Sequence, residues 1–211
     1  VGGRTQVLVQ AEATGPVSSK LVPKTSLSSR ILYSIYIAFT GAETLALCLA
    51  GMPFYDALLT SFATACTGGF SVRNASIAAY GLPACEIIVT VFMLLCSVNF
   101  AVYFLFLTRR LKQALRSDEL RFFLCAVLGA VALIFWNLLP SYDTVRHALR
   151  DTWFQVASVV STSGFSTADF AQWPVLSQLV LIGLMFLGGC AGSTAGGIKC
   201  SRILLMLRCA G

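Results

Sequence analysis

Four long apolar runs are the feature that most limits what this chain can fold into. They cover residues 31–52, 82–107, 120–139 and a segment that starts at residue 175. A helix needs about 20 residues to cross the hydrocarbon core of a bilayer, and runs of this length meet that need. Charged residues make up only 11% of the chain, whereas a soluble domain carries about 25%. The sequence therefore predicts an all-α integral membrane protein, and no signal peptide is expected because the first run begins only at residue 31.

The basic residues gather in the segments that would share one side of the membrane. With the N-terminus inside, these are residues 1–30, 108–121 and 199–211, which hold 12 of the 15 lysines and arginines. The outer segments hold only Arg73, Arg146 and Arg150. Cytoplasmic loops carry such an excess of positive charge, so the pattern predicts a cytoplasmic N-terminus for the chain. The net charge of +6 is then explained by topology, and no nucleic-acid partner is expected.

A segment of 17 residues occurs twice at an offset of 95 residues. DALLTSFATACTGGFSV covers 56–72 and DTWFQVASVVSTSGFST covers 151–167. The identical pairs are Asp56 and Asp151, Thr67 and Thr162, Gly69 and Gly164, Phe70 and Phe165, and Ser71 and Ser166. Each copy lies between two apolar runs and is followed by a proline, Pro83 or Pro174, that can occupy the first turn of the next helix. The chain is therefore predicted to contain two tandem repeats of span, short segment and span.

This repeat predicts the following organisation. Residues 1–30 connect to a preceding element, and the first repeat covers 31–107, with a first span at 31–52, a short helix and loop at 56–72 and a second span at 82–107. A cytoplasmic linker covers 108–119. The second repeat covers 120–211, with a first span at 120–139, a short helix and loop at 151–167 and a second span at 174–208 that is broken at 188–197.

Each short segment has the pattern of a re-entrant pore loop. Asp56 and Asp151 are predicted to be helix N-caps, and about ten residues of helix follow, too few to cross a bilayer. Glycine then ends the helix. Irregular backbone at membrane depth must be buried in protein or line a water-filled path, and its carbonyl oxygens can replace the hydration shell of a cation. External loops with glycine turns are the alternative, which two matched copies disfavour. The predicted cation-coordinating residues are Thr67, Gly68, Gly69, Phe70, Thr162, Ser163, Gly164 and Phe165.

A glycine-rich stretch, GGCAGSTAGGIK at 188–199, interrupts the last apolar run. It resembles a phosphate-binding loop, but Ile198 separates Gly197 from Lys199 and the stretch follows a span rather than a strand, so nucleotide binding is disfavoured. Gly188 to Gly197 is predicted to form a non-helical loop beneath the pore loops. The corresponding part of the first repeat reads LLCSVNFAVYF and is predicted to continue as an ordinary helix.

Several motifs together resemble the Trk/Ktr/HKT superfamily of potassium transporters, and within it the TrkH-like branch. They are AEATGPVSSKLVPKTS at 11–26, the two glycine loops, MLLCSVNFAVYF at 93–104 and GGCAGSTAGGIKCSR at 188–202. The resemblance implies four repeats around one K⁺ pore, with this chain as a fragment that holds the second and third. It places one filter glycine in each repeat, here Gly69 and Gly164. The sequence departs from the family at Ala195, where a further glycine is frequent, and at Cys66 before the first filter loop.

The resemblance also implies a gate, partners and a location. Residues of the intramembrane gating loop would be Gly188, Gly189, Gly192, Ser193, Thr194, Gly196, Gly197 and Lys199. The implied partners are a second copy in a homodimer, a cytosolic nucleotide-binding regulatory subunit of the TrkA type, and membrane lipids. The implied location is the bacterial cytoplasmic (inner) membrane. K⁺ would be the transported ion, with no covalently bound cofactor and no metal site beyond the filter.

Other candidate residues favour structural roles. Glu43, inside the first span, is a functional candidate by default, but a bond to a neighbouring loop is preferred. Asn99 is expected to bond to a neighbouring helix near Ala191, and His147 to lie on an outer loop. The cysteines have no metal-binding spacing and are interpreted as packing residues. No acid–base pair or metal cluster supports an enzyme. The alternative function is a secondary transporter that binds a small solute at the broken helix.

Overall fold

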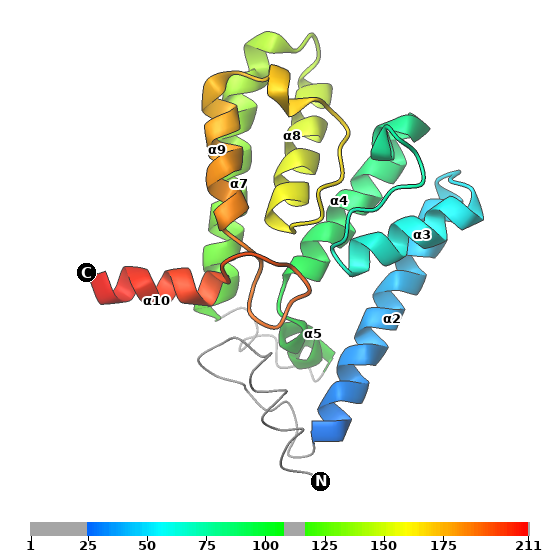
Figure 1. Cartoon of the computed structure of the whole chain (residues 1–211), viewed down its shortest axis with the longest axis vertical. Helices are drawn as coiled ribbons and strands as arrows, with labels where there is room; N and C mark the ends of the chain where they lie inside the picture. Colours follow the sequence, from blue (N-terminus) through cyan, green and yellow to red (C-terminus); the bar gives the residue numbers. More distant parts are fainter. Residues whose placement is uncertain (1–24, 108–116, 211) are drawn as a thin grey trace.

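The computed structural model describes residues 25–107 and 117–210 as a set of helices (Figure 1). The segment 1–24 and the basic linker residues 108–116 lie outside the described part of the chain. The first repeat contains α2 (Thr25–Leu49), α3 (Phe54–Ala65), η1 (Ser76–Tyr80), α4 (Pro83–Ser97) and α5 (Phe100–Leu107). The second contains α7 (Asp118–Leu138), η2 (Leu139–Ser141), α8 (Val145–Val160), η3 (Phe170–Gln172), α9 (Val175–Phe186) and α10 (Cys200–Ala210).

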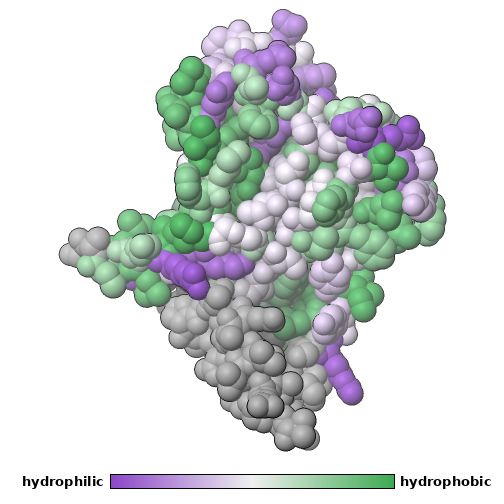
Figure 2. Space-filling view, viewed as in Figure 1, coloured by the Kyte–Doolittle hydropathy of each residue, from purple (hydrophilic) through white to green (hydrophobic). Residues whose placement is uncertain are grey.

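Two helices among the described residues are long and apolar enough to cross a membrane. They are Arg30–Leu49, of 20 residues, and Asp118–Ser141, of 24 residues. The surface is divided accordingly, because hydrophilic side chains gather at the end that carries the α7–α8 connection and the face over α9 is hydrophobic (Figure 2). Exposed apolar side chains such as Leu179 and Ile182 of α9 suit contact with lipid rather than water.

The two faces of α8 pack against different repeats. Val156 and Val160 pack into a core with side chains of α7 and α9, such as Ile134 and Leu181. Phe154 and Ala157 lie on another face of the same helix and pack among side chains of the first repeat. Residues three or four positions apart share a helix face, so this spacing gives α8 one face for each core. The short helix of the second repeat thereby holds the two repeats together.

The predicted second span of the first repeat, 82–107, is not one helix. α4 ends at Ser97, α5 begins at Phe100, and the two are bent by 94°. The prediction of an uninterrupted run was therefore wrong. Neither glycine nor proline marks the break, which is the usual sequence signal of a kink. Instead the Asn99 side chain caps α5, because its Oδ1 accepts a hydrogen bond from the Ala101 amide at 2.8 Å.

Asp56 and Asp151 are not the N-caps that the sequence predicted. Pro53 precedes α3 and places Asp56 inside its first turn, whereas Thr144 precedes α8 and lies seven residues before Asp151. Each carboxylate instead accepts a phenol hydrogen bond, from Tyr80 to Asp56 at 2.9 Å and from Tyr142 to Asp151 at 3.0 Å. Each aspartate thus ties the segment that holds the tyrosine to its short helix.

Burial, together with the neighbouring carboxylate, raises the pKa of both phenols. The pKa of Tyr142 rises to about 12, first because of burial and then because of Asp151. The pKa of Tyr80 is raised for the same reasons, with Asp56 as the neighbour. Both hydroxyls therefore stay protonated and remain donors at neutral pH.

Candidate functional site

The two short helices end in the same way, 95 residues apart. After α3 the amides of Gly68 and Gly69 donate to the Ala63 carbonyl at 2.8 and 3.4 Å. After α8 the amides of Ser163 and Gly164 donate to the Ser158 carbonyl at 3.1 and 3.3 Å. The C-terminal carbonyls of each helix, which have no partner within the helix, are thus used to fold the chain back on itself. The sequence repeat is therefore also a repeat of backbone structure.

Both loops also share an unusual backbone conformation. Thr67 and Thr162 have φ of 53° and 58°, and Gly69 and Gly164 have φ of 63° and 82°. The left-handed region is open to glycine, but a β-branched threonine there is a genuine outlier. Such a conformation costs on the order of 1–3 kcal/mol and persists only where its surroundings impose it. Its occurrence at matched threonines points to a functional constraint on both loops.

The carbonyl oxygens of these loops are the free polar groups of the site. Within the described part of the chain, the carbonyls of Thr67 to Gly69 and of Thr162 to Gly164 accept no hydrogen bond. The Phe165 carbonyl differs, since it accepts from the Ser158 hydroxyl at 2.6 Å. Ser163 is buried, Thr67 to Gly69 and Thr162 are half-buried, and Gly164 is exposed, so these carbonyls are open to a polar partner, and a dehydrated cation is one that fits them.

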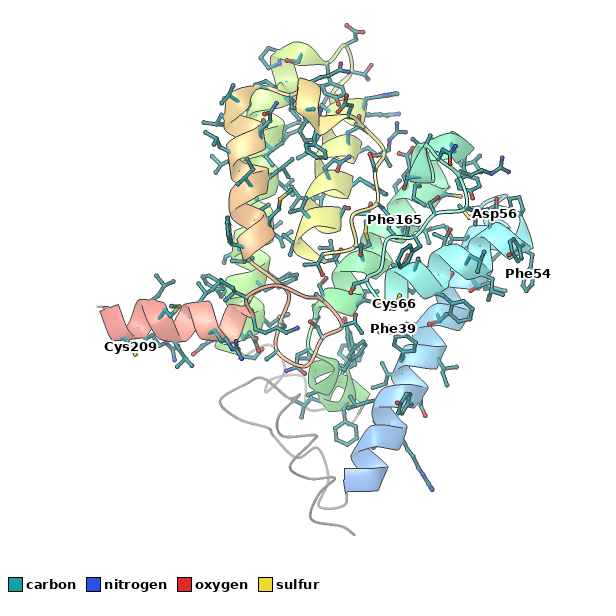
Figure 3. All side chains as sticks on the ribbon, viewed as in Figure 1. Phe39, Phe54, Asp56, Cys66, Phe165 and Cys209 are labelled. Carbon is teal, nitrogen blue, oxygen red and sulfur yellow. The ribbon has the colours of Figure 1, made fainter. Side chains whose placement is uncertain are left out.

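The two loops contact each other on one side only. A Cβ added to Gly69 would lie 1.8 Å from the Ser163 carbonyl oxygen, whereas a Cβ on Gly164 would meet nothing within 4 Å. The phenylalanines differ in the same way, because Phe165 is 1% exposed in the core of the first repeat and Phe70 is 78% exposed. Figure 3 shows Phe165 on the side of its loop that faces the first repeat.

The glycine-rich segment lies between α9 and α10 and is closed at its base. Leu187 and Ile198 form an isolated bridge, in which the Gly188 amide donates to the Ile198 carbonyl at 3.0 Å. A Cβ on Gly188 would lie 2.0 Å from the Gly196 carbonyl oxygen, and one on Gly197 would lie 2.9 Å from the Gly188 Cα. The two limbs of the loop, which meet at Gly188 and Gly197, can approach this closely only because both positions are glycine.

The tip of this loop reaches both pore loops. The Thr67 hydroxyl donates to the Thr194 carbonyl at 3.0 Å, and the Gly196 amide donates to the Thr162 hydroxyl at 2.7 Å. The Lys199 ammonium donates to the Ala195 carbonyl of the same tip. The two threonines in left-handed conformation are therefore the residues that join the pore loops to the glycine-rich loop.

The limbs of the loop bind to the break between α4 and α5 (Figure 1). The Cys190 amide donates to the Ser97 carbonyl at 2.9 Å, and the Phe100 amide donates to the Gly192 carbonyl at 3.1 Å. The Thr194 hydroxyl adds a bond of 3.2 Å to the Cys96 carbonyl. The break exposes backbone groups that an unbroken helix would use internally, and the loop occupies them.

Two candidates lie elsewhere than expected. Asn99 contacts the loop at Gly192, where an added Cβ would lie 3.0 Å from its Oδ1, rather than a neighbouring helix. His147 is exposed in the first turn of α8, not on an outer loop.

Glu43 is fully buried on α2, and the expected bond to an outer loop is absent among the described residues. Its carboxyl lies beside the hydroxyl of Thr64, which itself donates to the Thr60 carbonyl at 2.9 Å. No other partner for either carboxyl oxygen occurs in the part of the chain that the structure describes.

Glu119 is a site residue that sequence reasoning missed. One oxygen of its side chain accepts from the amides of Ala191 at 2.6 Å and Ser201 at 3.2 Å. In the sequence it is one of two acidic residues that begin α7, a common position for a carboxylate near a helix N-terminus. No local signal connects it with a loop more than 70 residues away.

The described residues contain no group of three or more histidine, cysteine, aspartate or glutamate side chains that could hold a metal ion. All eight cysteines are described, and each is free.

Comparisons with known proteins agree with this arrangement. Residues 3–209 match the TrkH family of cation transport proteins. The chain is 38% identical to the Trk system potassium uptake protein TrkH of Salmonella typhimurium and 37% identical to that of Escherichia coli K12, covering 99% of this chain and 44% of each relative.

A solved structure, the potassium transporter TrkH from Vibrio parahaemolyticus, superposes with a TM-score of 0.86 at 33% identity. The match covers 95% of this chain and 44% of that one. The chain thus spans less than half the length of the relatives it matches. With its family model matched almost from end to end, this all-α membrane protein belongs to the TrkH family, whose members are transporters and not enzymes.

Proposed function

We propose that this chain forms part of the pore of a potassium transporter. The carbonyls of Thr67 to Phe70 and of Thr162 to Phe165 would replace the water around K⁺ as it crosses. The observation that carries the proposal is the contrast between the amides and the carbonyls of these loops. Their amides are engaged with the ends of α3 and α8, and the carbonyls of Thr67 to Gly69 and Thr162 to Gly164 are left without a partner in the described chain. The names of the relatives supply K⁺ as the ion.

Two loops make only part of a ring around an ion. The open space at Gly164 and the exposed Phe70 mark the sides on which no other loop lies among the residues that the structure describes. The relatives are more than twice as long as this chain, so we propose that the complete protein closes the ring with further repeats. Translocation would then be a property of the complete protein.

The glycine-rich loop, 188–197, would be the gate of this pore. Its tip is hydrogen-bonded to both pore loops, so it lies across the end of the path that they line. Its base depends on two glycines in close contact, and glycine changes backbone conformation at low steric cost. Release of the tip would open the path, and the bonds seen here hold it closed.

A solute transporter with its site at the broken helix is less well supported. An anionic solute would need the free amides of the broken segment. The amides of Ala191 and Gly196 already donate to Glu119 and Thr162. These two amides of the glycine-rich loop are therefore already hydrogen-bonded within the protein and are not free to bind a solute.

The family also suggests a setting for the chain. We propose a bacterial cytoplasmic membrane, a cytoplasmic N-terminus, a homodimer, and a cytosolic regulatory subunit of the TrkA type. The basic residues of 1–30 and 108–121 would face that side together with anionic lipid head groups.

Flux through the full-length protein in proteoliposomes tests this function. Rb⁺ uptake should be inhibited by K⁺ at lower concentration than by Na⁺, and a variant shortened within 192–195 should show increased uptake. Gly129→Ala is the matched control, because Gly129 lies in α7 with nothing within 4 Å of an added Cβ. Uptake of Rb⁺ that requires a second solute would contradict the proposal.

A further inference from the structure

We propose that Glu119 is the positioning residue that holds the glycine-rich loop closed. The inference rests on the proposed role of the loop as a gate. One carboxylate oxygen binds the loop at Ala191 and the start of α10 at Ser201. A single side chain outside the loop therefore holds it on both sides of its tip.

The chemistry of this contact suits a carboxylate. Ser201 is the second residue of α10, so its amide has no partner within that helix. A negative charge is stabilised at that end of the helix, and hydrogen bonds to a charged acceptor are stronger than neutral ones. The loop thus depends on Glu119 for an acceptor that its own backbone does not supply.

Glu119 lies at the start of α7, beside a small cavity. It is the second residue of α7, directly after the linker 108–117 that joins the two repeats. Its carboxylate borders a cavity of about 30 Å³, lined by residues that include Val98, Asn99 and Cys190. The side chain therefore has space on one side.

The contact is specific to the second repeat. The offset of 95 residues places Lys24 at the position that corresponds to Glu119, a change of charge that would not accept hydrogen bonds. The first repeat also has no glycine-rich loop. Acceptor and loop therefore occur together in one repeat and are both absent from the sequence of the other.

The neighbouring carboxylate supplies a control. Asp118 forms an ion pair with Arg208 at 2.5 Å, and both side chains are more than half exposed. Exposed pairs of this kind contribute little to stability. Asp118→Ala removes the same charge one residue away without touching the bonds to the loop.

The test compares Glu119→Ala, Glu119→Gln and Asp118→Ala in the full-length protein, without its regulator. Loss of a hydrogen bond to a charged group corresponds to roughly a 10- to 100-fold change in an equilibrium constant, so Rb⁺ flux through Glu119→Ala should rise by about tenfold or more. Glu119→Gln, which keeps a neutral acceptor, should fall between this variant and the wild type. The preference for K⁺ over Na⁺ should not change, because the pore loops are untouched. Asp118→Ala should behave as wild type.

Labelling of Cys190 by a membrane-permeant maleimide, measured by mass spectrometry, reports the loop directly. Cys190 is 1% exposed, and release of the loop should expose it in Glu119→Ala but not in Asp118→Ala. Unchanged flux and unchanged labelling in both Glu119 variants would overturn the proposed role of Glu119, provided that the variant shortened within 192–195 conducts more. If shortening also leaves wild-type flux unchanged, the gate itself is refuted.

Discussion

The two repeats are alike at the pore loops and different below them. Both loops turn at a threonine and a glycine in left-handed conformation, and both fold back onto the carbonyl at equivalent positions, Ala63 and Ser158. Below them, two residues separate α4 from α5, whereas 187–199 separates α9 from α10. The difference therefore lies in the length of the interruption, since both second helices are broken.

The two interruptions are complementary. At the short break of the first repeat, the Ser97 carbonyl and the Phe100 amide lack partners within a helix. In the long break of the second repeat, the Cys190 amide donates to Ser97, and the Gly192 carbonyl accepts from Phe100. A duplicated element has thus diverged into a loop and the site that holds it. A change on either side of this contact should affect the other.

The largest expected effect separates the two filter glycines. Gly69→Ala places a Cβ 1.8 Å from the Ser163 carbonyl, so the two pore loops cannot keep their contact. We expect Rb⁺ uptake by the full-length protein to be abolished. Gly164→Ala meets nothing within 4 Å in this chain and should retain part of the uptake, since its cost here is the left-handed backbone, about 1–2 kcal/mol. Equal loss in both variants would show that another part of the protein contacts Gly164.

The next largest effect is expected at Phe165 and Phe70, and it is measured as a change in the free energy of unfolding. Phe165→Ala removes a fully buried ring and should lower the free energy of unfolding by about 3–5 kcal/mol. Phe70 is exposed in this chain, but a closed ring of repeats would cover it. Thermal unfolding of the full-length protein in detergent should therefore show a comparable loss for Phe70→Ala. A negligible loss at Phe70 would mean that the ring does not close on that side.

A smaller effect is expected at the break of the first repeat. Asn99→Ala removes the cap of α5 and should lower stability by about 1 kcal/mol. Asn99→Asp keeps an oxygen at the same place and should restore most of it. Comparing the melting temperatures of the two variants checks this, and identical losses would show that the side chain does not act as a cap.

An effect of similar size at neutral pH is expected at Tyr80 and Tyr142, where the repeats match. Tyr80→Phe and Tyr142→Phe each remove one hydrogen bond to an aspartate, with an expected net cost of about 1 kcal/mol. A clear difference between the two losses would argue against equivalent roles.

Tyr142 also predicts a dependence on alkaline pH. Its pKa is raised from 10.0 to about 12 in the folded chain, so the folded state holds this proton more tightly than the unfolded state. The stabilisation is complete below pH 10.0 and is lost as the pH rises towards about 12. The free energy of unfolding measured across that range should lose this pH-dependent component in Tyr142→Phe, and the wild-type protein is the reference.

Much of the fold and site could be predicted from local patterns. Apolar runs and low charge indicate a membrane protein, and the offset of 95 residues locates the two loops that share one backbone structure, because a repeated segment between repeated spans needs no long-range information. The glycine-rich loop can also be predicted locally, because the glycines of the stretch, among them Gly188 and Gly197, indicate a non-helical backbone by themselves. The predicted aspartate caps were wrong because α3 and α8 begin earlier than the polar residue that suggested their start.

Hydrophobicity, repetition and glycine content thus indicate a membrane protein and mark its two matched loops and its glycine-rich loop, because these properties reside in short stretches of residues. The fold alone brings Glu119 to Ala191, and the break at Ser97 to the loop that fills it. Those contacts join segments that are distant in the sequence, and each partner by itself has the pattern of an ordinary helix or an ordinary helix start. Their pairing is set by how the two repeats pack around α8, which no single stretch of the sequence encodes.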